Sequence, residues 1–378
     1  MTHRAALIAL LLGNFLVGVT VLAPAGMLAE LARGLAVSVP RAGLLVTYGA
    51  VVLCVGSPLM AWATSRLDRR LLLAGTALVI TVGHLASALA SDYDTLLILR
   101  LAMLPVVAVF TPQAAGTAAG LVAERERPRA IAFVFIGWSA AIAVGLMAVA
   151  FLAGHAGWQA TYAAIGMLGA LCFVMLAVAL PRGLRGEAVV FSTWTGLLRN
   201  RLVLVLLAVT GLQLGGQFVV FPFLGPLLTH FIGADSTMVA LFFAVFGVMG
   251  LIGNVVAAHL VGGWGPSRTA LFFIVTMLAG AVLWTLGAGA LVPMMLGNAL
   301  WGLGFAAVNS MQQARLALAA PAMAGAAIAL NTSCIYIGQG VGSATGGALY
   351  ALGWFSAMGV IAVGMLALAA LGLLIARR

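Results

Sequence analysis

The stretch Ala6–Ala29 reads ALIALLLGNFLVGVTVLAPAGMLA and contains no charged side chain. It is longer than the roughly 20 residues that an α-helix needs to cross a bilayer, where a helix satisfies its own backbone hydrogen bonds. Similar runs follow along the chain of 378 residues, which is 64% hydrophobic and only 7% charged. This composition predicts an integral membrane protein and excludes a soluble multidomain protein of the same length.

The apolar runs predict an all-α membrane protein with twelve transmembrane helices. The ends of such runs are uncertain by about 2 to 4 residues. We expect the spans at 4–29, 42–64, 71–90, 95–121, 130–153, 158–180, 202–229, 237–260, 268–288, 291–316, 324–350 and 355–376.

The placement of the basic residues indicates how the chain crosses the membrane. All eighteen are arginine, and a cytoplasmic N-terminus puts fifteen of them on the cytoplasmic side, Arg33 and Arg41 outside, and Arg100 within a span. Short loops rich in arginine stay inside, so both termini are predicted to be cytoplasmic. The net charge of +10 therefore indicates topology and not binding of nucleic acid. The lack of lysine suggests a GC-rich genome, and we expect a bacterial inner membrane.

An internal repeat divides the chain. GWQATY (Gly157–Tyr162) and GWFSAM (Gly353–Met358) each open the last span of a half, and Tyr48-Gly49 pairs with Phe246-Gly247 at nearly the same offset. Two parallel repeats of six spans are the arrangement of a transporter with its site between the repeats. We expect an N-terminal half at 1–180, a cytoplasmic linker at 181–201 and a C-terminal half at 202–378.

The loop AWATSRLDRR (Ala61–Arg70) resembles the signature of the major facilitator superfamily between spans 2 and 3. Arg66, Arg69 and Arg70 match the signature, whereas Asp68 stands where the family has glycine and Ser65 where it has an acid. The resemblance implies a conformational switch that clamps the inner helix ends, with Asp68 substituting for the missing acid. A simple positive-inside anchor is the alternative.

Other stretches resemble the drug and sugar efflux branch of that superfamily, which includes arabinose, nucleoside and chloramphenicol exporters. Leu300–Gly347 is similar to its spans 10 and 11, and Gly137, Ala141 and Gly145 match its span-5 motif. Small residues four apart also let two helices approach closely in lipid. The resemblance implies export of a small molecule by alternating access and exchange with protons.

The cavity-lining spans of this family, 1, 4, 7 and 10, concentrate uncharged polar and aromatic residues here. Each amide needs a partner in the membrane, either on another helix or on a ligand. Together they predict a site for a neutral polar or amphipathic molecule. The candidates for substrate binding are Asn14, Arg100, Gln213, Gln217, Trp301 and Asn309, with Tyr48, Trp138, Asn331 and Tyr336 from spans 2, 5 and 11; Thr20, Thr111, Gln113, Asn298, Gln312 and Gln339 accompany them. The candidates for the conformational switch are Arg66, Asp68, Arg69, Arg70, Gly137 and Gly145.

Two other classes of protein remain as alternatives, a polytopic membrane enzyme and a receptor that does not transport. The sequence has no H-E-x-x-H pair and no acid in the middle of a span, which disfavours the enzyme. We expect no cofactor and no metal site, and a monomer. Because all eight acids fall at span ends or in loops, coupling to protons is predicted to be weak or absent, against what the resemblance implies.

Overall fold

The computed structural model describes residues 3–64, 66–184, 197 and 199–376. The first half begins with α1 (His3–Gly26), the short α2 (Leu28–Gly34), α3 (Val39–Ala63), α4 (Arg69–Ala88) and α5 (Tyr93–Gly120). It continues through η1 (Glu124–Glu126), α6 (Arg127–Ala140), the π-helical η2 (Ala141–Gly145) and α7 (Leu146–Ala179). The second half comprises α9 (Arg201–Val220), η3 (Phe221–Phe223), α10 (Leu224–Ile232), α11 (Ser236–Leu286), α12 (Leu291–Ala319), η4 (Pro321–Met323), α13 (Ala324–Ala351) and α14 (Phe355–Ile375).

The described helices account for the twelve predicted spans. Nine continuous helical stretches of the described residues are long and apolar enough to cross a membrane. Two of them are too long for one crossing: Glu124–Ala179, 56 residues from η1 through α7, and Ser236–Leu286, the 51 residues of α11. Each of the two contains a glycine with non-helical angles, Gly157 (φ 86°) or Gly265 (φ 72°), where the chain turns back. Splitting them gives eleven spans, and the 28-residue α13 is the twelfth. The predicted ends agree with the observed ones to within a few residues.

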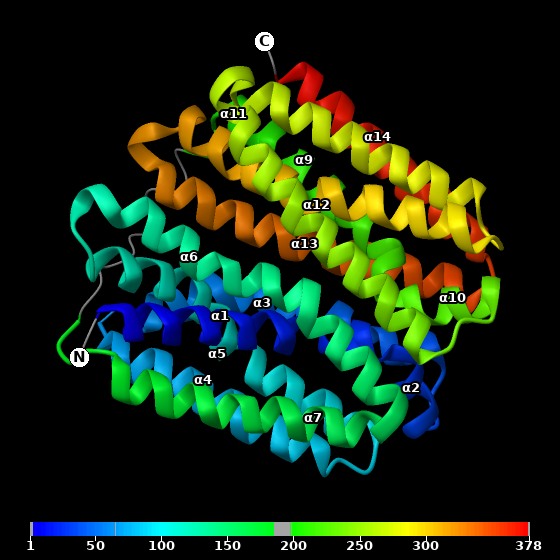
Figure 1. The fold of residues 1–378 in the computed structure, drawn as a ribbon, viewed down its shortest axis with the longest axis horizontal. Helices are drawn as coiled ribbons and strands as arrows, with labels where there is room; N and C mark the ends of the chain where they lie inside the picture. The colour runs from blue at the N-terminus through cyan, green and yellow to red at the C-terminus, as the bar shows by residue number, and fades with distance from the viewer. Residues whose placement is uncertain (1–2, 65, 185–196, 198, 377–378) are drawn as a thin grey trace.

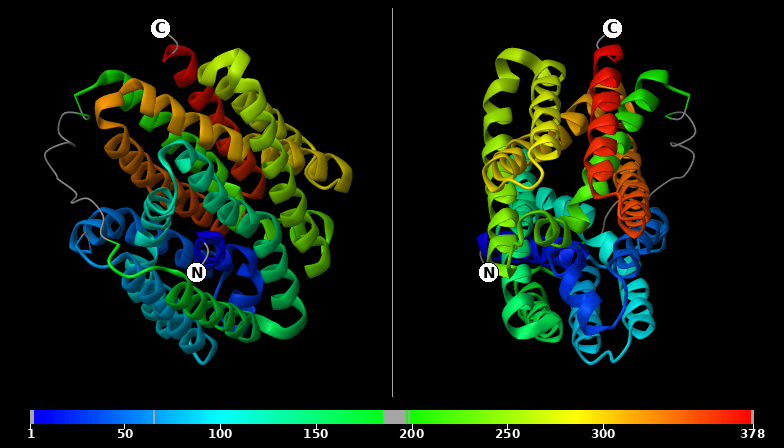
Figure 2. Two further views of the ribbon diagram at one scale, coloured as in Figure 1. Left: turned by 60° about the vertical axis from the view of Figure 1, so that its left-hand side comes forward. Right: turned by 90° about the vertical axis from the view of Figure 1, so that its right-hand side faces the viewer.

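The helices form two bundles of six spans. In Figures 1 and 2 the helices α1–α7 (blue to green) gather in one group and α9–α14 (green to red) in another. The bundles meet along α3 against α13, and along η2 and α7 against α11. Spans 2 and 11 thus form one contact and spans 8 and 5 the other, as expected when two repeats exchange places about a pseudo-two-fold axis.

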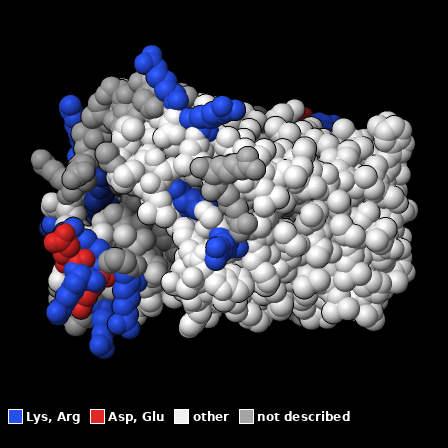
Figure 3. All heavy atoms as spheres, turned by 90° about the horizontal axis from the view of Figure 1, so that it is seen from above, with Lys and Arg blue, Asp and Glu red and all other residues white. Residues whose placement is uncertain are grey.

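Charged residues gather at one end of the molecule, which we call the arginine-rich end. It includes the N-terminus and the loops before Arg69 and before Arg127, and Figure 3 shows most of the visible blue and red atoms in the left half of the surface. The end that carries α2 and the Gly157 turn is the opposite end. A charge-free band between two polar ends is the surface that a bilayer requires.

Proline affects the predicted spans in different ways. Span 7 is interrupted at η3, where Pro222 lies, and continues as α10. Span 4 remains one helix, α5, although Pro105 and Pro112 both lie inside it. Most of the expected linker, residues 185–196 and 198, lies outside the described residues.

Candidate functional site

Buried polar atoms without hydrogen-bond partners concentrate in the second bundle. Among the described residues nine such side-chain atoms occur, and six of them belong to α9, α12 and α13. Both amide atoms of Gln213 lack a partner, although the residue is 0% exposed. The other four atoms are Gln217 Oε1, Trp301 Nε1, Asn309 Oδ1 and Asn331 Nδ2. All five residues were candidates for substrate binding on sequence grounds.

A small cavity brings part of this set together. Its volume is about 10 Å³, room for roughly one water molecule. Its lining includes the polar side chains of Gln217 from α9 and of Asn298 and Trp301 from α12, together with Trp284 from α11. Asn298 Nδ2 donates to the carbonyl of Phe242 at 2.9 Å, so the unsatisfied groups at the cavity are the acceptor Gln217 Oε1 and the donor Trp301 Nε1.

Close packing of α9 against α13 explains why these glutamines face the bundle interior. A side chain on Gly338 would clash with the backbone of Gly211, and one on Gly342 with the backbone of Gly215. Glycines therefore occupy one face of α9 and let the two backbones touch. Gln213 and Gln217 lie on another face of α9, spaced four residues apart, and Gln217 points toward α12.

Toward the arginine-rich end, the polar groups of the second bundle bond to one another. Thr210 Oγ1 donates to Asn331 Oδ1 at 2.7 Å, and Gln312 Nε2 donates to the carbonyl of Leu206 at 3.0 Å. Gln312 Oε1 accepts from Arg315 Nη1 at 3.1 Å. Gln312 is therefore used within the protein, whereas Asn331 keeps its Nδ2 without a partner.

In the first bundle, the corresponding amide is satisfied. Asn14 is 0% exposed, its Nδ2 donates to the carbonyl of Val134 at 3.0 Å, and its Oδ1 accepts from Thr111 Oγ1 at 2.7 Å. These bonds join α1 to α6 and α5. Asn14 thus has an interhelical partner for both of its functional groups.

Arg100 is buried and bonded entirely to backbone carbonyls. Its Nε donates to Leu45 at 2.9 Å, Nη1 to Thr20 at 3.1 Å and Nη2 to Val21 at 2.9 Å. Pro24 lies four residues after Thr20 and has no N–H, so the Thr20 carbonyl lacks its helical donor and Arg100 supplies one. The guanidinium holds α5 against α1 and α3.

Three of the four aromatic candidates, Tyr48, Trp138 and Tyr336, do not line the small cavity, whereas Trp301 does. Tyr48 is 43% exposed, on the face of α3 that also presents Val51 and Val55. Trp138 of α6 is partly buried and lies beside Gly18 of α1. Tyr336 is buried on α13, as is Gln339, and Gln113 is partly buried on α5. Tyr48 and Trp138 are therefore not placed with Gln217 and Trp301 at the cavity.

The switch candidates of the loop before α4 fix the start of that helix. Asp68 Oδ1 accepts from the backbone N–H groups of Arg70 and Leu71 at 2.9 and 3.2 Å, and Oδ2 accepts from Gly183 at 2.5 Å. The N–H of Arg69 also donates to the carbonyl of Leu184 at 2.8 Å. Asp68 and Arg69 thereby bind the loop to the chain that follows span 6. Arg66 is exposed, Arg70 is partly exposed and Arg69 is buried.

The stripe of Gly137, Ala141 and Gly145 packs on α1. A side chain on Gly137 would clash with the backbone of Leu11, and one on Gly145 would press on Val19. The other side of η2 meets the second bundle, because a side chain on Gly247 of α11 would clash with the backbone of Ala143. The π-helical turn is therefore held between α1 and α11, and π-helical turns are frequent at functional sites.

Contacts between the bundles at the opposite end were not expected from the sequence. Thr47 Oγ1 of α3 donates to Ser343 Oγ of α13 at 3.0 Å. Nearby, the buried ring of Phe223 fits against Gly43 of α3 and Gly346 and Gly347 of α13, and stacks on Tyr350 with 5.6 Å between ring centroids. The spacing of hydroxyl residues and glycines along an apolar span does not indicate which helix that span will contact.

Glu30, Asp235 and His84, the groups considered as proton carriers, each make at least one polar contact within the protein, although His84 Nδ1 has no partner. Glu30 pairs with Arg33 at 3.0 Å, and Asp235 accepts from the N–H of Met238 at 2.8 Å, capping α11. His84 is 1% exposed, with Nε2 3.2 Å from Thr20 Oγ1, and it stacks on Tyr162. Glu187 lies outside the described residues. Among the described residues, no three His, Cys, Asp or Glu side chains form a group that could hold a metal ion.

Comparison with known proteins identifies the fold and its relatives. A family model described as "Major Facilitator Superfamily" matches residues 10–288. The chain is 30% identical over 363 residues to the "Inner membrane transport protein YdhP" of Escherichia coli K12, covering 95% of this chain and 93% of that protein. It is 26% identical to a "Probable sugar efflux transporter" of Pasteurella multocida, covering 89% of this chain and 83% of that protein.

Solved structures share the architecture at low sequence identity. A bacterial homologue of the human lysosomal transporter Spinster superposes with a TM-score of 0.77 at 16% identity, covering 98% of this chain and 96% of that chain. A D-xylose-proton symporter superposes with a TM-score of 0.73 at 17% identity, covering 96% of this chain and 97% of that chain. These similarities confirm the predicted fold of two six-helix bundles.

Proposed function

Because this chain belongs to the Major Facilitator Superfamily, a family of secondary transporters and not of enzymes, we propose that it exports a small neutral polar or amphipathic molecule. A sugar, a nucleoside or a drug fits this description. The export direction is supported by its likeness to a protein named as a probable sugar efflux transporter. Transport would proceed by alternating access, with one bundle rocking against the other.

The set of unpartnered polar atoms on α9, α12 and α13 carries this proposal. Gln213, Trp301 and Asn331 offer donors, and Gln213, Gln217 and Asn309 offer acceptors. None of these side chains is charged. Buried polar groups normally have partners, so a ligand with hydroxyl or amide groups would relieve the cost of burying them. A charged substrate would need an opposite charge in the same place, which this set does not provide.

We propose a bacterial inner membrane as the location, with both termini cytoplasmic. The apolar helices show a multi-pass membrane protein. The similarity to an inner membrane protein of Escherichia coli supports the bacterial inner membrane as its location. The arginine-rich end would then be cytoplasmic. The halves 1–180 and 202–378, joined by 181–201, are supported by the two bundles of helices.

A ligand screen followed by a transport assay tests the function. Sugars, nucleosides and amphenicol-type drugs would be added to purified protein, and a ligand of the folded state should raise its unfolding temperature. Vesicles loaded with that ligand should then lose it faster with the protein than without it. Binding without faster loss would support a receptor, and chemical conversion of the ligand would support an enzyme; either result would overturn the proposal.

A further inference from the structure

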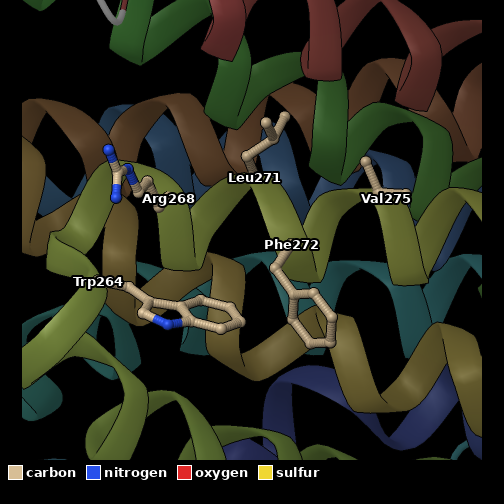
Figure 4. A pocket seen from close by; sticks show the side chains of 5 residues that line it. All are labelled: Trp264, Arg268, Leu271, Phe272 and Val275. Atoms are coloured by element: carbon tan, nitrogen blue, oxygen red, sulfur yellow. The ribbon is translucent and has the colours of Figure 1, made fainter.

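An open hollow of about 400 Å³ lies on the outside of the second bundle at the arginine-rich end. Its walls are Trp264, Arg268, Leu271, Phe272 and Val275, all from α11, and Figure 4 shows the Trp264 and Phe272 rings side by side with Arg268 above them. The two rings meet edge to face with centroids 5.7 Å apart. The hollow adjoins the turn at Gly265, where span 8 ends and span 9 begins.

The lining residues change from polar to apolar along span 9. Trp264 and Arg268 lie at the arginine-rich end of the span, and Leu271, Phe272 and Val275 follow toward its middle. Arg268 and Val275 are seven residues apart, about 10 Å along a helix. Tryptophan and arginine prefer the interface of a bilayer, and the side chains deeper in the hollow suit its hydrocarbon.

The charge of Arg268 is available for an anion. Within the described part of the chain, ion pairs are formed by Arg33 with Glu30 and by Arg41 with Asp94, and not by Arg268. Trp264, Phe272 and Val275 are each between 45% and 50% exposed, so the hollow opens to the surroundings of the bundle. A cation at one end of an apolar groove matches a molecule with an anionic head and a hydrocarbon tail.

We propose that this hollow binds an anionic phospholipid of the leaflet at the arginine-rich end. Its phosphate would lie against the guanidinium of Arg268, and an acyl chain would lie along the rings of Trp264 and Phe272 and along Leu271 and Val275. A free phosphate ion would leave the apolar wall uncovered, and a zwitterionic lipid would not balance the charge. The proposal depends on the orientation of span 9 in the bilayer and not on the transported substrate, so either can fail without the other.

Quenching of Trp264 by brominated lipid tests the proposal directly. The protein would be reconstituted in phosphatidylcholine with increasing fractions of brominated phosphatidylglycerol, or of brominated phosphatidylcholine. The contribution of Trp264 is the difference between wild type and Trp264→Phe. One arginine near an anionic surface is worth about 1 kcal/mol, so half-quenching should need about five-fold less of the anionic lipid.

Charge variants and a second tryptophan provide the controls. Arg268→Gln should remove the preference for anionic lipid, and Arg268→Lys should restore most of it. Arg182→Gln, which removes an exposed arginine outside the hollow, should leave it unchanged. Trp354, 61% exposed at the opposite end, should show no preference when measured through Trp354→Phe. Equal quenching of Trp264 by both lipids, persistence of the preference in Arg268→Gln, or its displacement by millimolar inorganic phosphate would overturn the proposal.

Discussion

Gln213 and Asn14 are both buried amides on cavity-lining spans, yet only Asn14 has hydrogen-bond partners in the protein. Replacing each amide by leucine is therefore expected to have opposite effects on ligand binding and on stability at the two positions. Replacing both partners of a buried hydrogen bond by apolar groups changes the free energy of unfolding little. Removing one partner and leaving the other buried without a bond lowers it more. Under the proposed function Gln213 serves a ligand and Asn14 serves helix packing, and this difference in stability and binding distinguishes the two roles.

Gln213→Leu should weaken substrate binding without destabilising the fold. The change removes no hydrogen bond of the protein, so the unfolding temperature should stay the same or rise. Loss of one or two bonds to a neutral ligand, at about 1 kcal/mol each, should weaken binding roughly five- to thirty-fold. Ligand titration and thermal unfolding of the same sample measure both effects, with the exposed amide variant Gln159→Ala as the control.

Asn14→Leu should show the reverse. It would leave Thr111 Oγ1 and the Val134 carbonyl without partners and lower stability by about 2 kcal/mol, while the folded fraction keeps its affinity. A stable Asn14→Leu protein that has lost binding would place the substrate in the first bundle and contradict the assignment.

Arg100 and Pro24 should be energetically coupled, because Arg100 donates to the Thr20 carbonyl that Pro24 leaves free. Arg100→Met should destabilise by about 3 kcal/mol or more, since three buried carbonyls lose a charged donor. In a Pro24→Ala background the residue at 24 regains its N–H, and the same change should cost about 1 kcal/mol less. A double-mutant cycle by thermal unfolding measures the difference; additive effects would show that Arg100 does not replace the missing helical donor.

At the scale of elements, the sequence predicts where helices begin and end more reliably than what they touch. Hydropathy sets the span limits because lipid demands an apolar segment of fixed length, and the break at Gly157 followed from the repeat of Gly-Trp at both final spans. The close packing of Gly137 and Gly145 was also expected from their spacing. The carbonyl partners of Arg100, the contact of Thr47 with Ser343 and the π-helical turn depend on which helices become neighbours, and hydropathy carries no such information.

The start of α4 should be sensitive to acid. Slight desolvation raises the pKa of Asp68, but hydrogen bonds from Gly183, Leu71 and Arg70 and the charge of Arg70 outweigh it and hold the pKa below its usual 3.8. A depressed pKa in the folded state stabilises the protein above pH 3.8, and this contribution is lost as the pH falls through the folded-state value. Asp68→Asn should therefore lower the unfolding temperature at pH 7, and the gap from wild type should close below pH 3.8. A gap that stays constant down to pH 2 would mean that the charge of Asp68 is not involved.

At the scale of the whole molecule, energy coupling should be weak. A proton carrier must titrate near neutral pH, which carboxylates do when buried, yet the described acids cap helices, form ion pairs or are exposed. In proteoliposomes an imposed pH gradient should drive little substrate accumulation, while exchange down a concentration gradient continues. Strong accumulation that disappears in Glu30→Gln or Asp235→Asn would identify an ordinary proton antiporter.

Rocking of the bundles requires the contact at the opposite end to separate in every cycle, and the hydroxyls of Thr47 and Ser343 lie 3.0 Å apart across it. In a background without Cys54, Cys172 and Cys334, the pair Thr47→Cys and Ser343→Cys should form a disulfide under oxidation, because the two side chains already touch and a disulfide needs such close approach. Transport should then stop and return after reduction. The control pair Asn254→Cys and Ser310→Cys replaces a contact of 2.7 Å inside the second bundle, and its oxidation should leave transport intact. Transport at the normal rate by fully cross-linked Thr47–Ser343 protein would show that this end stays closed throughout the cycle. Because rocking requires this end to open, that result would contradict alternating access by rocking.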